Sequence, residues 1–224
     1  MTSIGNDIIS LNAINPQRTK QVRFYSKIVS PSELKLYSTE EFSGMSFGNF
    51  VWLAWSIKES VYKFQKRNFP DLKFSPAKIE IDKIDFPKKN LVPKFKNFEF
   101  KQDFFYKDEF HIGTARFENN IFYFKSIINE KVISTVVSND EKFENTWWGF
   151  KSIDDNNYES QSKEVRTFLL NELKKIFPKN SFNIRKHEIG YPVLVREGKD
   201  TDIPVSFTHH DHFVGYSFLI KDVI

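Results

Sequence analysis

Hydrophobic and polar residues along the chain follow a helical spacing in two places. Between residues 49 and about 66, apolar residues recur every three or four positions, which is typical of a helix with one buried face. A second such helix is predicted at about 160–177, with Pro178 ending it. The apolar faces consist of Phe50, Ala54, Ile57, Val61 and Phe64 in the first helix and Val165, Phe168, Leu169, Leu173 and Ile176 in the second.

Short runs rich in β-branched and aromatic residues predict strands after each helix. After the first helix they lie at 78–82, 121–124 and 131–137, with turns expected at 119–120 and 129–130. After the second helix they lie at 182–187, 191–195 and 204–220. The segment 85–107 is rich in Phe and Lys and is expected to be a loop with short strands, whose role stays open.

The first 36 residues combine a short apolar strand with basic residues. Residues 4–11 predict a strand that Asp7 interrupts, and 16–36 predict a basic helix or turn followed by a short helix. Ser30, Pro31 and Glu33 form a capping-box pattern at the start of that short helix.

The order of helix and strands therefore occurs twice, at a spacing of about half the chain. This repeat predicts an α+β fold with two similar half-units, each a helix packed on a small, mostly antiparallel sheet. Residues 140–157 are polar apart from Trp147 and Trp148 and are the expected boundary. The predicted half-units are 1–139 and 140–224.

Composition excludes several classes of protein. With 40% hydrophobic and 28% charged residues the chain is expected to be globular, and the absence of cysteine excludes disulfides, thiolate metal sites and a cysteine nucleophile. Its densest apolar stretch, 50–55, is far shorter than the roughly 20 residues of a membrane helix, and no secretory signal is evident. We therefore expect a cytoplasmic protein. The net charge of +4 says little about partners by itself.

Three polar clusters are candidates for chemistry. Asp7 stands at the end of a short strand, or is a turn residue near a frayed terminus. Glu59 and Lys63 lie one helical turn apart, which by itself is compatible with an exposed ion pair worth a few tenths of a kcal/mol. Residues 206–212 hold three of the five histidines, which permits either a metal site or a strand end with one functional histidine.

Together these clusters resemble the signatures of the 4'-phosphopantetheinyl transferase superfamily. The matching segments are residues 5–8 (GNDI), 55–63 (WSIKESVYK) and 206–209 (SFTH), of which the middle one is the specific motif. Residues 23–30 and 190–192 (GYP) give further matches. The resemblance implies two half-units related by a pseudo-twofold axis. It also implies transfer of the phosphopantetheine arm of coenzyme A to a serine of an acyl or peptidyl carrier protein, with release of adenosine 3',5'-bisphosphate.

The resemblance also implies roles for individual residues. Asp7 and Glu59 would hold Mg²⁺, with Mn²⁺ possible, and Glu59 would take the serine proton directly or through a metal-bound water. Lys63 would neutralise charge on the transferring phosphate. Lys58 would either contact phosphate or form a structural pair. The residues expected to bind the 3'-phosphate of coenzyme A are Ser206, Thr208 and His209.

The chain departs from the family pattern in composition and in order. Ile9 stands where larger members often carry a third acid, so water would replace that ligand. Tyr191 replaces the usual Lys, and Arg196 or Lys199 is expected to supply the missing anion contact. The serine–histidine motif comes last, as in the small holo-acyl-carrier-protein synthases. We interpret this order as a monomer with swapped half-units and an internal cleft; the alternative is a small oligomeric synthase with a long insertion.

Basic residues after the first strand are candidates for partner binding. Arg18, Arg23 and Lys27 would steer an acidic carrier protein, although a solvated basic face is the ordinary interpretation. Two other functions stay open: a non-catalytic module that binds coenzyme A or a carrier protein, and a metal hydrolase built on residues 209–212. The pathway, whether fatty-acid, polyketide or peptide synthesis, is also open.

Overall fold

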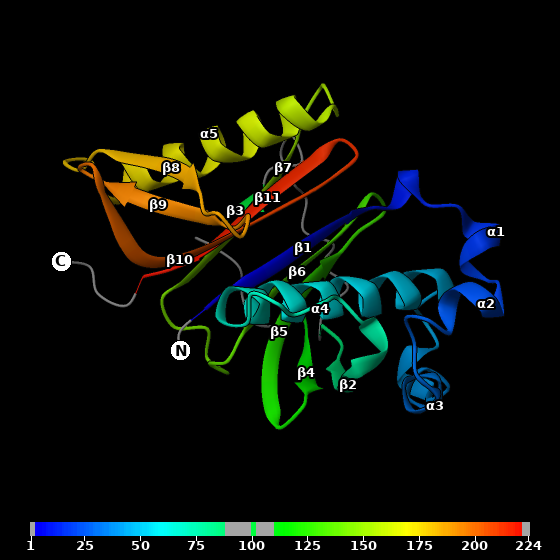
Figure 1. Cartoon of the computed structure of the whole chain (residues 1–224). Helices are drawn as coiled ribbons and strands as arrows, with labels where there is room; N and C mark the ends of the chain where they lie inside the picture. The colour runs from blue at the N-terminus through cyan, green and yellow to red at the C-terminus, as the bar shows by residue number, and fades with distance from the viewer. Residues whose placement is uncertain (1–2, 88–99, 102–109, 221–224) are drawn as a thin grey trace.

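Two antiparallel sheets, each with one long helix, make up the fold in the computed structural model (Figure 1). The structure describes residues 3–87, 100–101 and 110–220. The first sheet has the strand order β1-β6-β5-β4-β2, with β1 (Gly5–Ser10), β2 (Ile79–Asp85), β4 (His111–Phe117), β5 (Asn120–Ile128) and β6 (Val132–Ser138). The second has the order β3-β7-β11-β10-β9-β8, with β3 (Phe100–Lys101), β7 (Thr146–Ser152), β8 (Phe182–Lys186), β9 (Pro192–Arg196), β10 (Lys199–His210) and β11 (Phe213–Leu219).

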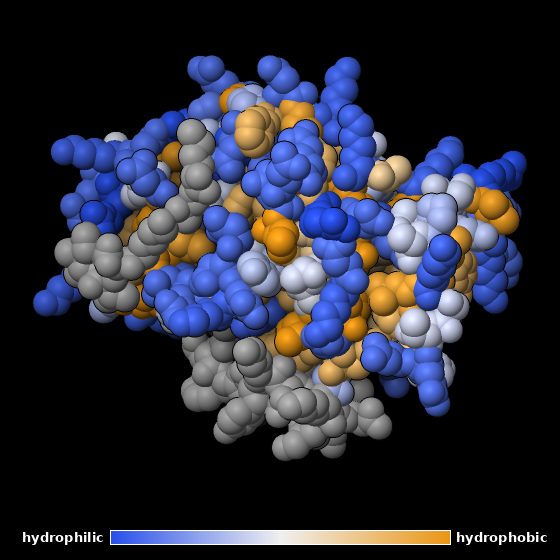
Figure 2. All heavy atoms as spheres, turned by 90° about the horizontal axis from the view of Figure 1, so that it is seen from below, coloured by the Kyte–Doolittle hydropathy of each residue, from blue (hydrophilic) through white to orange (hydrophobic). Residues whose placement is uncertain are grey.

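The helices differ widely in length. The long ones are α4 (Phe47–Asn68) and α5 (Tyr158–Ile176), and the short ones are α1 (Pro16–Thr19), α2 (Val22–Tyr25) and α3 (Pro31–Tyr37). The described residues also form three short 3-10 helices: η1 (Leu11–Ala13), η2 (Glu40–Phe42) and η3 (Pro76–Lys78). No helix in these described ranges has the length and apolar character needed to cross a membrane. Figure 2 shows hydrophilic side chains over most of the coloured surface seen from below.

The two sheets repeat one topology. In the first, β1 is followed by α4 and then by β2, β4, β5 and β6, and the last strand returns to pair with the first. In the second, β7 is followed by α5 and by β8, β9, β10 and β11, and β11 returns to pair with β7. The predicted α+β fold with two similar half-units and a pseudo-twofold axis is thereby confirmed. A complete second unit argues against the alternative of a small synthase with a long insertion.

Most predicted elements are present, but β4 was not predicted and two other segments differ from their prediction. Both long helices extend about as predicted, and the capping box of Ser30 and Glu33 opens α3. The expected boundary 140–157 contains β7, whose Trp148 is buried between the sheets. Residues 204–220 form the end of β10 and all of β11, joined by a turn. Of the segment 85–107, residues 88–99 and 102–107 lie outside the described part. The division at 139 stays a prediction.

A glycine allows β1 to lie directly against α4. A Cβ atom at Gly5 would stand 2.0 Å from the carbonyl oxygen of Ser60, so any other residue would push the strand away from the helix. Asp7, two residues further, has its side chain on the same side of the strand. This contact therefore brings the strand's carboxylate to the helix that carries Glu59.

The outer edge of β1 is satisfied by side chains of β10. The backbone N–H of Ile8 donates to the hydroxyl of Thr208 (3.0 Å), and that of Ser10 donates to Nδ1 of His210 (2.8 Å). An exposed strand edge would leave these groups unpaired. The two half-units are thus joined along β1. Apolar packing between the sheets adds to this junction through Ile4, Ile8, Trp148, Phe150 and Phe213.

Lys58 forms a wholly buried ion pair with Glu33. The Lys58 ammonium donates to Glu33 (2.8 Å) and to the carbonyl of Ile28 (2.6 Å), and both charged side chains are 0% exposed. Glu33 also accepts from the backbone N–H groups of Ser30 (2.7 Å) and Ile81 (2.8 Å). The pair therefore ties α3 to α4 and β2. The prediction that Lys58 contacts a phosphate is wrong, and the structural alternative describes it.

We expect Glu33→Gln to lower the free energy of unfolding by about 3–5 kcal/mol, because it leaves the Lys58 charge buried without a counter-charge. Chemical denaturation monitored by circular dichroism measures this change. The exposed residue Glu141 offers a matched control, and Glu141→Gln should have little effect. The double variant Glu33→Gln, Lys58→Met should recover much of the loss. An equally unstable double variant would contradict the assignment of the cost to an unpaired charge.

Candidate active site

Asp7 and Glu59 meet at the ammonium of Lys63. Lys63 Nζ lies 3.0 Å from Asp7 Oδ1 and 3.3 Å from Glu59 Oε1. Glu59 and Lys63 share one face of α4 because they are four residues apart, and the close approach at Gly5 supplies Asp7. The structure therefore brings the two predicted acids, one from a strand and one from a helix, within reach of a single cation.

Thr208 positions Asp7 and does not line the neighbouring pocket. Its hydroxyl donates to Asp7 Oδ1 (3.1 Å) while it accepts from the backbone N–H of Ile8 (3.0 Å). The side chain is buried, so it is not presented to a ligand. The prediction that Thr208 binds a phosphate of coenzyme A is therefore corrected. The hydroxyl instead joins the second half-unit to the acidic centre.

The acidic centre carries unbalanced negative charge. Burial raises the pKa of Asp7 to about 6; the Glu59 carboxylate adds to this rise, and Lys63 opposes it. Burial disfavours the charged form of Lys63, but the carboxylates of Asp7 and Glu59 outweigh burial and raise the pKa of this lysine. One ammonium between two carboxylates is thus insufficient to neutralise the centre.

The donor set fits a hard divalent cation. Asp7 Oδ2 is buried and has no hydrogen-bond partner within the described ranges, so it has a free lone pair. Carboxylate oxygens are the protein ligands that Mg²⁺ prefers, together with water and phosphate oxygens. Asp7 and Glu59 are the residues that would hold the ion.

The histidines near the end of β10 have separate surroundings. Nδ1 of His210 accepts from the backbone of Ser10, and Nδ1 of His212 lies 3.1 Å from the carbonyl oxygen of Ile153. The His209 ring instead lies edge-on to Tyr158, with the ring centres 5.9 Å apart. In the part of the chain that the structure describes, no three His, Cys, Asp or Glu residues form a metal-binding group. This arrangement gives no support to a hydrolase built on residues 209–212.

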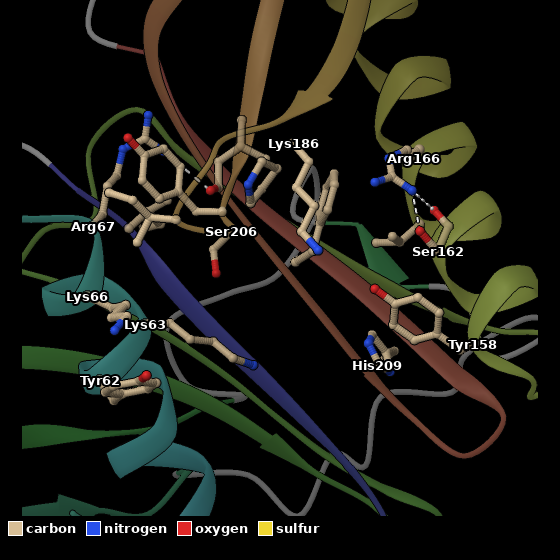
Figure 3. A pocket seen from close by; sticks show the side chains of 18 residues that line it. Tyr62, Lys63, Lys66, Arg67, Tyr158, Ser162, Arg166, Lys186, Ser206 and His209 are labelled. Carbon is tan, nitrogen blue, oxygen red and sulfur yellow. Dashed lines mark hydrogen bonds between the residues drawn. The ribbon is translucent and has the colours of Figure 1, made fainter. Parts of the chain in front are cut away.

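A basic pocket of about 360 Å³ adjoins the acidic centre (Figure 3). It lies between α4 of the first half-unit and α5 with strands β8–β10 of the second. None of the described residues that line it is acidic. Its basic side chains are Lys63, Lys66, Arg67, Arg166, Lys186 and His209. The pocket is therefore suited to an anion, and Lys63 belongs both to it and to the acidic centre.

Ser206 and His209 line this pocket as predicted for anion ligands. Figure 3 shows the Ser206 and His209 side chains around the same pocket as those of Lys63 and Lys186. Burial is the largest cause that lowers the pKa of His209, and the charge of Lys63 lowers it further. Burial and the charge of Lys63 thus favour the neutral form of this ring.

Sequence reasoning missed four basic residues of the pocket: Lys66, Arg67, Arg166 and Lys186. Arg67 follows Lys63 by one helical turn, a spacing that points to the same helix face. Arg166 and Lys186 come from α5 and β8, and no sequence signal joins them to the motifs. The expected substitutes for the missing lysine, Arg196 and Lys199, face each other across the β9–β10 turn and do not line the pocket.

Tyr191 supports an arginine instead of supplying a charge. The Arg67 guanidinium lies 4.8 Å from the centre of the Tyr191 ring, and this ring stacks on His187 with centres 4.3 Å apart. Such a stack fixes the orientation of the guanidinium. The position that was expected to carry lysine thus contributes to the pocket indirectly.

The three predicted partner-binding residues also lie together. Arg18, Arg23 and Lys27 line a surface hollow of about 480 Å³ with Gln21 and Phe24. The Arg18 guanidinium lies 5.0 Å from the centre of the Phe24 ring. The hollow is formed by α1, α2 and the residues that follow α2. The structure therefore has a basic surface with an aromatic residue at this place.

Comparison with known proteins gives a family match. Residues 3–115, just over half of the chain, match the family model described as the 4'-phosphopantetheinyl transferase superfamily. No curated protein and no solved structure matches the chain.

The metal-free protein should become more stable through Asp7 as the pH falls. The folded-state pKa of about 6 lies above the ordinary value of 3.8, so the folded state takes up a proton first and the stabilisation develops as the pH falls below about 6. From about pH 7.5 to 5.5, we expect wild type to gain roughly 1 kcal/mol of unfolding free energy relative to Asp7→Asn. Urea denaturation in EDTA at both pH values measures this. The same pH dependence in both proteins would contradict the assignment to Asp7.

Proposed function

Because the chain belongs to the 4'-phosphopantetheinyl transferase superfamily, we propose that it transfers the phosphopantetheine arm of coenzyme A to a serine of an apo carrier protein. The observation that carries this proposal is the contact of Asp7 and Glu59 through Lys63 beside a basic pocket. An acidic centre suits a divalent cation, and a basic pocket suits a phosphorylated nucleotide.

In the proposed reaction, the carrier serine oxygen forms a bond to the phosphorus that bears the pantetheine arm. The bond from that phosphorus to the leaving 5'-phosphate oxygen breaks, and adenosine 3',5'-bisphosphate departs. Glu59, whose side chain is 26% exposed, takes the serine proton. A cation on Asp7 and Glu59 would neutralise charge on the pyrophosphate oxygens.

The basic pocket holds the coenzyme in this proposal. Ser206 and His209 bind the 3'-phosphate, while Arg67 and Lys186 supply further positive charge on two sides of the pocket. Lys63 stabilises the charge that develops on the transferring phosphate. Both half-units contribute lining residues, so one chain provides the whole site and we propose that a monomer suffices.

The basic hollow of Arg18, Arg23 and Lys27 is the proposed docking surface for an acidic carrier protein. The neighbouring Thr19 accepts a hydrogen bond from Trp52 on α4 (3.1 Å). Trp52 precedes Glu59 by seven positions, which is about 10 Å along a helix. A carrier docked on the hollow is therefore close enough to present its serine to Glu59.

Glu59→Gln should strongly slow transfer while leaving coenzyme A binding intact. We expect a fall in rate of at least about 100-fold, because the variant loses both a proton acceptor and a carboxylate ligand. Mass spectrometry of an apo carrier protein incubated with coenzyme A and Mg²⁺ detects the added phosphopantetheine. Calorimetry measures the binding of coenzyme A.

The exposed Glu144 offers a matched control, and Glu144→Gln should transfer normally. Absence of transfer by wild type to any carrier tested, including the carrier proteins of its own organism, would contradict the proposed reaction. If wild type still bound coenzyme A, the chain would instead be a binding module of the same fold.

Arg23→Glu should weaken the use of the carrier protein without changing coenzyme A binding. We expect KM for the carrier to rise by about tenfold at low salt, because like charges then face each other, and the difference to shrink as salt screens them. Steady-state kinetics at two salt concentrations measures this effect. Lys35→Glu, an equal charge reversal at an exposed position on α3, is the control. Equal effects of both variants would argue against a specific docking surface.

A further inference from the structure

Lys63 stands between the acidic centre and the basic pocket. Its ammonium contacts Asp7 and Glu59, and its side chain also lines the basic pocket. Figure 3 shows this side chain leaving α4 and extending toward β1. The side chain is 23% exposed, and a lysine stem has several rotatable bonds, so the ammonium has room to turn.

The carboxylates are incompletely balanced by this lysine. Asp7 and Glu59 carry two negative charges when ionised, and Lys63 supplies one positive charge. Asp7 Oδ2, buried and unpartnered in the described ranges, receives nothing from the ammonium. A divalent cation matches both the charge and this unused oxygen better than a lysine does. An ammonium and a divalent cation on the same oxygens would also repel each other.

We propose that Lys63 is a displaceable counter-ion, whose ammonium holds Asp7 and Glu59 together until a divalent cation releases it toward the phosphate pocket. The nature of the cation rests on the proposed function. The released ammonium adds a positive charge to the pocket, and a phosphate ligand that attracts Lys63 uncovers the carboxylates. Binding of the cation and binding of the phosphate ligand therefore strengthen each other, and by linkage they do so by the same factor.

Removal of this counter-ion should strengthen the binding of a divalent cation, whereas removal of a metal ligand would weaken it. Lys63→Met should bind Mn²⁺ about tenfold more tightly than wild type in the absence of any nucleotide, because the cation no longer competes with an ammonium. Electron paramagnetic resonance of free Mn²⁺ during a titration at about pH 8.5 measures the affinity, a pH well above the pKa of about 6 of Asp7.

Controls separate charge from other effects of the substitution. Lys63→Gln is a second neutral variant that should also bind Mn²⁺ more tightly. Lys66→Met removes a lysine from the same pocket that instead donates to the carbonyl of Leu72 (2.9 Å), and it should bind Mn²⁺ as wild type does.

Linkage gives a second measurement. Adenosine 3',5'-bisphosphate should tighten Mn²⁺ binding by wild type, and this enhancement should be about tenfold smaller in Lys63→Met, which has no ammonium to withdraw. Any direct contact between the nucleotide and the ion is common to both proteins. Equal enhancement in the two proteins would overturn the inference.

The titration also separates this inference from the proposed function. Mn²⁺ binding by wild type, with equal or weaker binding by both neutral variants, would overturn the displacement of Lys63 and leave the proposed transferase intact. If wild type bound no Mn²⁺ at all, both the inference and the metal-dependent reaction would be wrong.

Discussion

The site depends on the direct contact between β1 and α4. Gly5 leaves no side chain between the strand and the backbone of Ser60, and only at this separation does Asp7 reach Lys63. β1 pairs with β6 along one edge. Along the opposite edge it is held by Thr208, whose hydroxyl accepts from the backbone N–H of Ile8 and donates to the Asp7 carboxylate. The strand is thus fixed by both half-units, and the acidic centre exists because they meet there.

This junction places opposite charges side by side. An acidic centre with a net negative charge adjoins a pocket lined by basic groups, and Lys63 belongs to both. Separated charges of this kind suit a ligand that carries several phosphates and a metal ion together, since each part meets its opposite charge. The same arrangement keeps Asp7 at a raised pKa, because burial and Glu59 outweigh one lysine.

Neighbouring residues of one motif serve different purposes. Glu59 faces the site, whereas Lys58, adjacent to it on the helix, points into the core and pairs with Glu33. A rotation of about 100° per residue separates their directions. The charged pair in the core links α3 and β2 to the helix that carries the site, so a motif lysine supports the position of its neighbour without contacting the pocket.

The sequence alone determined the periodic elements: both long helices, most strands and the repeat of the half-units. These follow from local spacing. That Asp7 and Glu59 act at one site was implied by the family resemblance of their motifs, and not by spacing. Only the tertiary structure decided which groups the side chains of Thr208, Lys58 and Arg67 contact. Whether a hydroxyl faces a carboxylate or a pocket depends on how two sheets meet, and a contact between residues some 200 positions apart has no periodicity to reveal it.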